Sequence, residues 1–167
     1  MSFKIMRMAG AFALLSTAAL AQAVAPAAVP GAMSGHQPDA FKHLSVAEQA
    51  ALVAKPGPGG LTLSVISDHE NWYSEALGRT TSGVVEVHDH WIDVMTVLSG
   101  DATLTIGGTV TGGQPTGPGE TRGGQITGGT IVQVHPGDYI QIPAGTPHLT
   151  TLAPGTTFHA MVVKVRQ

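Results

Sequence analysis

The sequence of 167 residues has the length of one domain, and 43% of its residues are apolar, which is enough for one sizeable core. Charged residues make up only 11%, the net charge is −3 and the basic residues are scattered, which argues against a helical bundle and a nucleic-acid-binding surface. The absence of cysteine excludes disulfides, thiolate metal sites and cysteine nucleophiles. The 22 glycines and 11 prolines favour short strands joined by tight turns.

The N-terminal residues 1–23 have the pattern of a secretory signal peptide. Lys4 and Arg7 precede an uncharged apolar run over residues 8–20, and A-x-A cleavage patterns lie at 19–21 and 21–23. The run is short for a membrane span, which takes about 20 residues. We therefore expect cleavage, a periplasmic or secreted mature protein, and no membrane association after cleavage.

Residues 24–44 are rich in Ala, Pro and Gly and are expected to form a flexible tail before a folded domain over 45–167. This domain begins with the capping-box pattern S-x-x-E at residues 45–48, which predicts a short helix running to about Ala54. The Pro- and Gly-rich stretch 55–60 would end that helix.

Short segments rich in β-branched residues follow from residue 61 onwards, and turn residues separate them. We expect strands over residues 61–67, 72–77, 84–90, 92–98, 102–106, 130–134, 139–142, 148–152 and 157–165. Many short strands at regular spacing indicate an all-β sandwich or barrel.

Residues 107–129 form a glycine-rich insertion with four Gly-Gly pairs and few large apolar side chains. We interpret this segment as a long hairpin or loop between two halves of the sheet. Long loops in compact domains are often functional, so a lid over a barrel mouth is one reading. The other interpretation is a surface excursion, that is, a loop on the surface without a role.

The pattern His88-Asp89-His90 is the sharpest local signal for chemistry. Residues two apart on a strand point to one face, so both imidazoles can bind one metal ion, and Glu86 shares that parity. Asp93 would begin the next strand and complete a donor set for Mn, Fe, Ni or Zn. His148 follows a Pro-x-Gly turn and opens a later strand.

These residues resemble two motifs of the cupin superfamily. The first motif, G-x5-H-x-H-x3or4-E-x6-G, is approached by Gly83, His88, His90, Asp93 and Gly100. The second motif, G-x5-P-x-G-x2-H-x3-N, is approached by Gly137, Pro143, Gly145 and His148, with Leu152 in place of Asn.

The first motif is shortened in this sequence. Only four residues separate Gly83 from His88, and Asp93 follows His90 after two residues. Either Asp93 or Glu86 would therefore provide the carboxylate ligand. An inward Glu86 would also be a candidate catalytic base or would orient a histidine, whereas an outward Glu86 would be an ordinary exposed residue.

The resemblance implies an all-β fold, the cupin-type double-stranded β-helix or jelly-roll barrel, with the short helix at its N-terminal end. It also implies one divalent transition metal ion held by His88, His90, Asp93 and His148, and a homodimer formed through an N-terminal strand. Strand parity suggests a pocket wall made of Met95, Val97, Tyr139 and Gln141.

The cupin superfamily contains many activities, so the reaction must be argued from the site. We expect a metal-dependent enzyme of the dioxygenase (oxidoreductase), isomerase or lyase type that acts on a small oxygen-rich molecule. A non-catalytic module that binds a small ligand or a metal is the alternative. Nucleic acid is not an expected partner.

Overall fold

The computed structural model describes residues 40–167, of which residues 42–167 form one compact unit. The expected signal peptide and most of the expected tail lie outside the described residues. Within 40–167, no helix is long and apolar enough to cross a membrane.

Helix α1 (Val46–Leu52) is the short helix that the capping box predicted. The Ser45 hydroxyl accepts a hydrogen bond from the Glu48 backbone N–H, and the Glu48 carboxylate accepts one from the Ser45 backbone N–H. These reciprocal bonds satisfy free amide groups at the start of the helix. The helix ends two residues earlier than expected, and a 3₁₀ turn (Pro58–Gly60) leads into the first strand.

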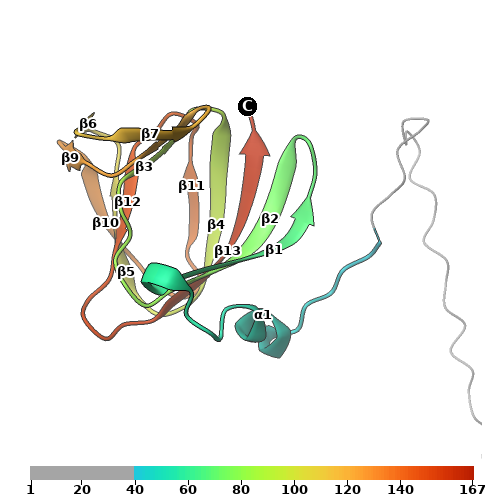
Figure 1. Ribbon diagram of the computed structural model, residues 1–167. Coiled ribbons are helices and arrows are strands. Elements are labelled where there is room, and N and C mark those ends of the chain that lie inside the picture. Colours follow the sequence, from blue (N-terminus) through green and yellow to red (C-terminus); the bar gives the residue numbers. More distant parts are fainter. Residues whose placement is uncertain (1–39) are drawn as a thin grey trace, which may run out of the picture. The chain divides into compact units, whose positions relative to one another are not determined.

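Two antiparallel sheets make up the barrel (Figure 1). The first sheet has the strand order β1 (Leu61–Asp68), β2 (Trp72–Arg79), β13 (Phe158–Arg166), β4 (Trp91–Ser99) and β11 (Tyr139–Ile142). The second sheet has the order β10 (Thr130–Val134), β5 (Ala102–Ile106), β12 (His148–Thr151), β3 (Glu86–His88), β8 (Glu120–Arg122) and β7 (Gln114–Gly117). A separate ribbon pairs β6 (Thr109–Thr111) with β9 (Gln125–Thr127).

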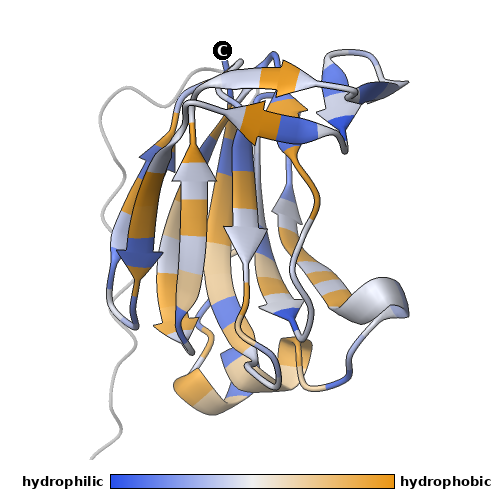
Figure 2. Ribbon diagram, turned by 90° about the vertical axis from the view of Figure 1, so that its left-hand side faces the viewer, coloured by the Kyte–Doolittle hydropathy of each residue, from blue (hydrophilic) through white to orange (hydrophobic). Residues whose placement is uncertain are grey.

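The inward side chains change character along the barrel. On β13, alternate residues are buried, and the series runs from Phe158 through Ala160 and Val162 to Lys164. The same change occurs on β4, from Val97 through Met95 to Asp93, and Figure 2 shows apolar and polar residues alternating along several strands. One end of the barrel therefore holds the apolar core, and the other end holds buried charges.

The glycine-rich insertion belongs to the barrel and is not a surface excursion. Its strand β8 pairs with β3, so that Glu86 lies opposite Arg122 and His88 lies opposite Glu120. Glycine is required at the turn beside this hairpin, because Gly124 has φ +80° and a Cβ there would lie 2.3 Å from the Thr111 carbonyl oxygen. The insertion thus adds charged side chains to the polar end of the barrel.

Strand β3 is shorter than the expected strand over 84–90. It ends at His88, and Asp89 and His90 form the turn that leads to β4. This turn carries the chain from the six-stranded sheet into the five-stranded sheet. His90 consequently leaves the strand and becomes exposed.

Candidate functional site

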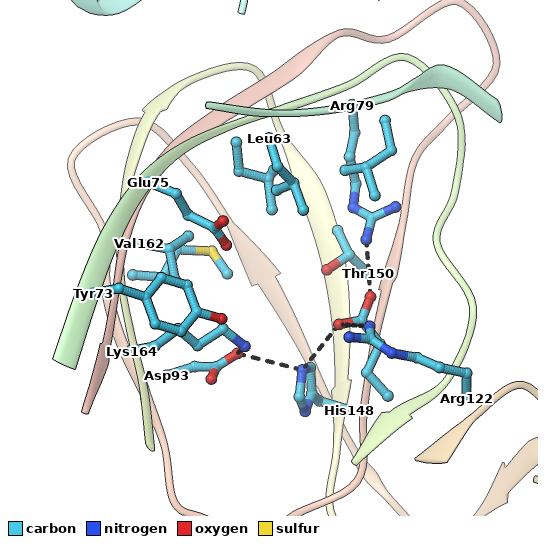
Figure 3. A pocket seen from close by; sticks show the side chains of 14 residues that line it. Leu63, Tyr73, Glu75, Arg79, Asp93, Arg122, His148, Thr150, Val162 and Lys164 are labelled. Atoms are coloured by element: carbon cyan, nitrogen blue, oxygen red, sulfur yellow. Dashed lines mark hydrogen bonds and ion pairs between the residues drawn. The ribbon is translucent and has the colours of Figure 1, made fainter. Parts of the chain in front are cut away.

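A cavity of about 210 Å³ lies at the polar end of the barrel. Strands β1, β2, β4 and β13 line it from one sheet, and β3, β8 and β12 line it from the other. Figure 3 shows charged side chains from both sheets converging on this space.

Three buried or half-buried side chains bring metal-binding atoms together at one wall. Glu86, His88 and His148 each offer one ligand atom, and these atoms lie within 4.8 Å of one another. The geometry follows from the sheet register, since Glu86 and His148 are direct partners on the adjacent strands β3 and β12. Residues Glu86 and His88 are two apart on β3 and therefore share a face.

Asp93 reaches the same group from the facing sheet. Its Oδ2 lies 3.7 Å from His88 Nε2 and 3.6 Å from His148 Nε2. The carboxyl is 4% exposed, and Oδ1 is buried without a hydrogen-bond partner among the described residues. A buried carboxylate oxygen without a hydrogen-bond donor is costly, so this atom is available to bind a metal ion or to accept a hydrogen bond.

The hydrogen bonds of the two histidines fix the tautomers of their rings. Lys164 Nζ lies 2.8 Å from His88 Nε2, and an ammonium can only donate, so Nε2 accepts and Nδ1 donates to Glu120 Oε2 at 2.7 Å. In His148, Nδ1 donates to the Thr146 carbonyl at 3.1 Å. Both Nε2 atoms therefore carry a lone pair that faces the carboxylates, as a metal ligand requires.

Burial lowers the pKa of His148, although its bond to the Thr146 carbonyl and nearby carboxylates act in the opposite direction. The neutral form of the ring is favoured as a result. Neutral imidazole is the form that binds a metal ion.

Lys164 is the only buried ammonium among the residues that the structure describes. It lies directly opposite Asp93 in the pairing of β13 with β4, and its Nζ is 2.6 Å from Asp93 Oδ2. The ammonium therefore bridges a carboxylate and a histidine lone pair at the centre of the site.

Two arginines enclose the Glu86 carboxylate. Arg79 Nη2 lies 3.0 Å from Oε1, and Arg122 Nη1 forms an ion pair with Oε2. Burial is the largest single influence on Glu86 and raises its pKa. The positive charges of Arg122 and Arg79 outweigh burial and lower the pKa to about 2. Glu86 is thus ionised, which is the form in which a carboxylate binds a metal ion.

The donor set fits a divalent transition metal ion. The two imidazole nitrogens with lone pairs and the Glu86 carboxylate lie within 4.8 Å of one another. Asp93 Oδ2 lies 3.7 Å and 3.6 Å from those nitrogens, and such a set of donors suits Mn, Fe, Ni or Zn. Glu86, His88, His148 and Asp93 would hold the ion. Glu120 would orient His88 in the way that outer carboxylates orient metal-bound histidines.

The structure brings together only part of the expected ligand set. His88, Asp93 and His148 meet at the site, and Glu86 faces inward beside them. His90 is outside this group, because it lies in the exposed turn after β3.

The expected pocket wall also differs from the observed one. Met95 lines the cavity, whereas Val97 lies one pleat further along β4 in the apolar core. Tyr139 and Gln141 share a face as expected, but that face is exposed because Ile140 and Ile142 point inward.

A different alignment of the first motif would have found the site. When Glu86 and His88 are taken as the paired ligands, four residues separate His88 from Asp93, as the motif requires, and the six-residue gap from Asp93 to Gly100 remains. Lys164, Glu120 and Arg122 carry no comparable sequence signal, because long-range strand pairing brings them to the site.

No family model and no curated protein matches the sequence. Solved structures do match the fold. A protein from Bacillus halodurans is 14% identical with a TM-score of 0.55, over 79% of this chain and 85% of its own. A Klebsiella pneumoniae protein described as having a double-stranded β-helix domain is 19% identical with a TM-score of 0.53, over 74% and 84%. A Streptococcus pyogenes protein of unknown function is 17% identical with a TM-score of 0.51, over 76% and 91%. The described part of this chain therefore has the double-stranded β-helix fold.

Proposed function

We propose that this protein is a metal-dependent cupin enzyme that acts on a small oxygen-rich molecule in the barrel cavity. The observation that carries the proposal is the convergence of Glu86, His88 and His148 donor atoms within 4.8 Å. Glu86 and His148 of this group line the cavity. The facing carboxylate of Asp93, with its orphaned Oδ1, supports a fourth ligand. The reaction would be of the dioxygenase, isomerase or lyase type.

A bound metal ion would supply a Lewis acid for an oxygen atom of the ligand. The protein side chains would do the remaining work. Arg79 and Arg122 keep Glu86 ionised. Glu120 holds the His88 ring in the tautomer whose Nδ1 carries the proton and whose Nε2 has the lone pair. The cavity of about 210 Å³ limits the ligand to a small molecule.

A non-catalytic binding module is the second candidate, and the position of Lys164 favours it. Its Nζ lies between His88 Nε2 and Asp93 Oδ2, where it already provides a positive charge. In such a module the ammonium would remain in place and bind an anionic ligand without a metal ion.

Metal content distinguishes the two candidates. Purified protein, analysed for Mn, Fe, Ni and Zn before and after stripping and resupply, should contain about one ion per chain if the first proposal holds. His88→Ala and His148→Ala should each lose the ion. His43→Ala, which removes an exposed histidine outside the barrel interior, should retain it. A wild-type protein that binds none of these metals would contradict the metal-dependent function and favour the binding module.

We also propose that the protein is exported, from the signal-peptide pattern of residues 1–23. N-terminal sequencing of protein recovered from the periplasm or the medium should then find a start shortly after residue 21 or 23. A chain that retains Met1 would contradict export by this route.

A further inference from the structure

Glu75 is a buried acid without a partner in the cavity. It lies on β2 with 6% of its surface exposed, lines the cavity and points into it (Figure 3). Among the described residues, no hydrogen bond or ion pair engages its carboxyl. The other acids of the site are engaged: Glu86 by two arginines, Asp93 by Lys164, and Glu120 by His88 and Arg122.

The surroundings of Glu75 favour a neutral carboxyl. Burial is the main influence and raises its pKa, and the negative charges of Asp93 on β4 and Glu86 on β3 act in the same direction. Lys164 on β13 and His88 on β3 lower it. Tyr73 and Arg79 on the same strand and Arg122 on β8 also line the cavity.

The apolar side chains around Glu75 leave it free to act on a ligand. Val162 lies directly opposite Glu75 on β13, and Leu63 of β1 lines the same part of the cavity. Neither side chain can donate a hydrogen bond, so the Glu75 carboxyl can accept one from water or from the ligand.

Glu86, which the sequence suggested as a catalytic base, is unsuited to that role. Both of its oxygens form ion pairs with arginine, and its pKa of about 2 makes it a weak base. General bases work best when their pKa lies near the working pH, and burial is one way to raise that of a carboxyl. Burial shifts the pKa of Glu75 in this direction, whereas the pKa of Glu86 is shifted away from it.

We propose that Glu75 is the general base of the cavity and takes a proton from the carbon next to the carbonyl of a small ligand bound against Glu86, His88 and His148. The proposal rests on the metal-dependent function above. In the proposed step, the C–H bond next to the ligand carbonyl breaks, the proton goes to the Glu75 carboxylate, and the electron pair stays on the ligand. The neutral acid that forms is tolerated by the apolar wall.

Pyruvate is a suitable probe, because it carries two oxygens that can chelate a metal and exchangeable protons next to its carbonyl. We expect the metal-loaded protein to accelerate the exchange of pyruvate methyl protons for deuterium in D₂O, followed by proton NMR. Glu75→Gln should reduce this acceleration about 100-fold or more, with the metal content unchanged. Glu70→Gln, at an exposed glutamate in the β1–β2 turn, is the matched control and should exchange as wild type. Equal exchange by Glu75→Gln and wild type, or no acceleration by metal-loaded wild type, would overturn the proposal.

A second measurement needs neither metal nor activity. In protein labelled with carbon-13 at the glutamate carboxyl carbons, the signal missing from Glu75→Gln reports the titration of Glu75. We expect its midpoint to lie above the ordinary glutamate range in the metal-free protein. A midpoint within that range would overturn the role of Glu75 even if the protein binds a metal. An elevated midpoint in a protein that binds no metal would support a reactive Glu75 and contradict only the metal-dependent function.

Discussion

Lys164 Nζ lies 2.8 Å from His88 Nε2 and donates a hydrogen bond to the lone pair that a metal ion would use. The same ammonium is 2.6 Å from Asp93 Oδ2. Metal binding through His88 therefore requires Lys164 to withdraw from this nitrogen, so the lysine competes with the ion for one donor atom.

We predict that Lys164→Met binds the metal about tenfold more tightly than wild type, or about 1.4 kcal/mol. The substitution removes a positive charge next to the incoming cation and frees both His88 and Asp93. Competition with a chromophoric chelator measures the affinity. Lys55→Met, at an exposed lysine before the barrel, is the control and should have the wild-type affinity. Unchanged or weaker binding by Lys164→Met would show that the lysine does not compete.

The same substitution should destabilise the metal-free protein. Removing one partner of a buried ion pair leaves the Asp93 carboxylate uncompensated, which typically costs about 3–5 kcal/mol. We expect a lower Tm for metal-free Lys164→Met and a larger rise in Tm on metal addition than in wild type. Calorimetry with and without metal would test both, and equal Tm values for the metal-free proteins would contradict the prediction.

Glu120→Ala should weaken metal binding about 10- to 100-fold. The carboxylate accepts the Nδ1 proton of His88, and its loss removes both the orientation and the added basicity of the ring. The same chelator assay measures the effect. The control is Glu48→Ala, which affects only the cap of α1 and should retain full affinity. Full affinity in Glu120→Ala would mean that His88 does not depend on the insertion.

His90→Ala should retain the metal, whereas His88→Ala should lose it. Both histidines belong to one H-x-H pattern, but only His88 lies beside Glu86 and His148, because the chain turns after it. Elemental analysis of the two variants provides the comparison. Loss of metal from His90→Ala would restore the ligand set that the sequence pattern suggested.

Glu75→Gln should stabilise the protein at neutral pH and have no effect in acid. Burial raises the pKa of Glu75 above its ordinary value of 4.5, so its contribution to stability is fully present below that pH and is lost as the pH rises through the folded-state pKa. The neutral glutamine does not suffer this loss. Thermal unfolding across this pH range should show wild type and variant converging at the acid end. A constant difference in Tm would contradict the titration of Glu75.

The sequence was sufficient to predict the fold, because strands, turns and the capping box have local signals. The expected strand over 84–90 shows a limit of prediction from local signals. The period-2 pattern continues through His90, but the chain changes sheets after His88 and this crossing has no local signature. The second motif, which includes the Pro-Gly turn before His148, placed its histidine at the cavity wall as expected.

The residues that surround the ligands could not be found from the sequence. Lys164 is separated from Asp93 by 71 residues, and Glu120 from His88 by 32. The register of strands distant in sequence decides these contacts. Glu75 is equally inconspicuous, since only the closed barrel reveals that its strand turns this carboxyl toward the cavity.

Because of the glycine-rich insertion, the proposed metal ligands and the residues that hold those ligands in place come from different segments of the chain. The proposed ligands come from the barrel strands, while Glu120 and Arg122, which hold His88 and Glu86, come from one hairpin. Substitutions in that hairpin can therefore alter the charge and orientation of the ligands without changing any ligand. Grafting hairpins of different sequence between β5 and β10 would be a way to tune which metal such a barrel prefers while its framework stays constant.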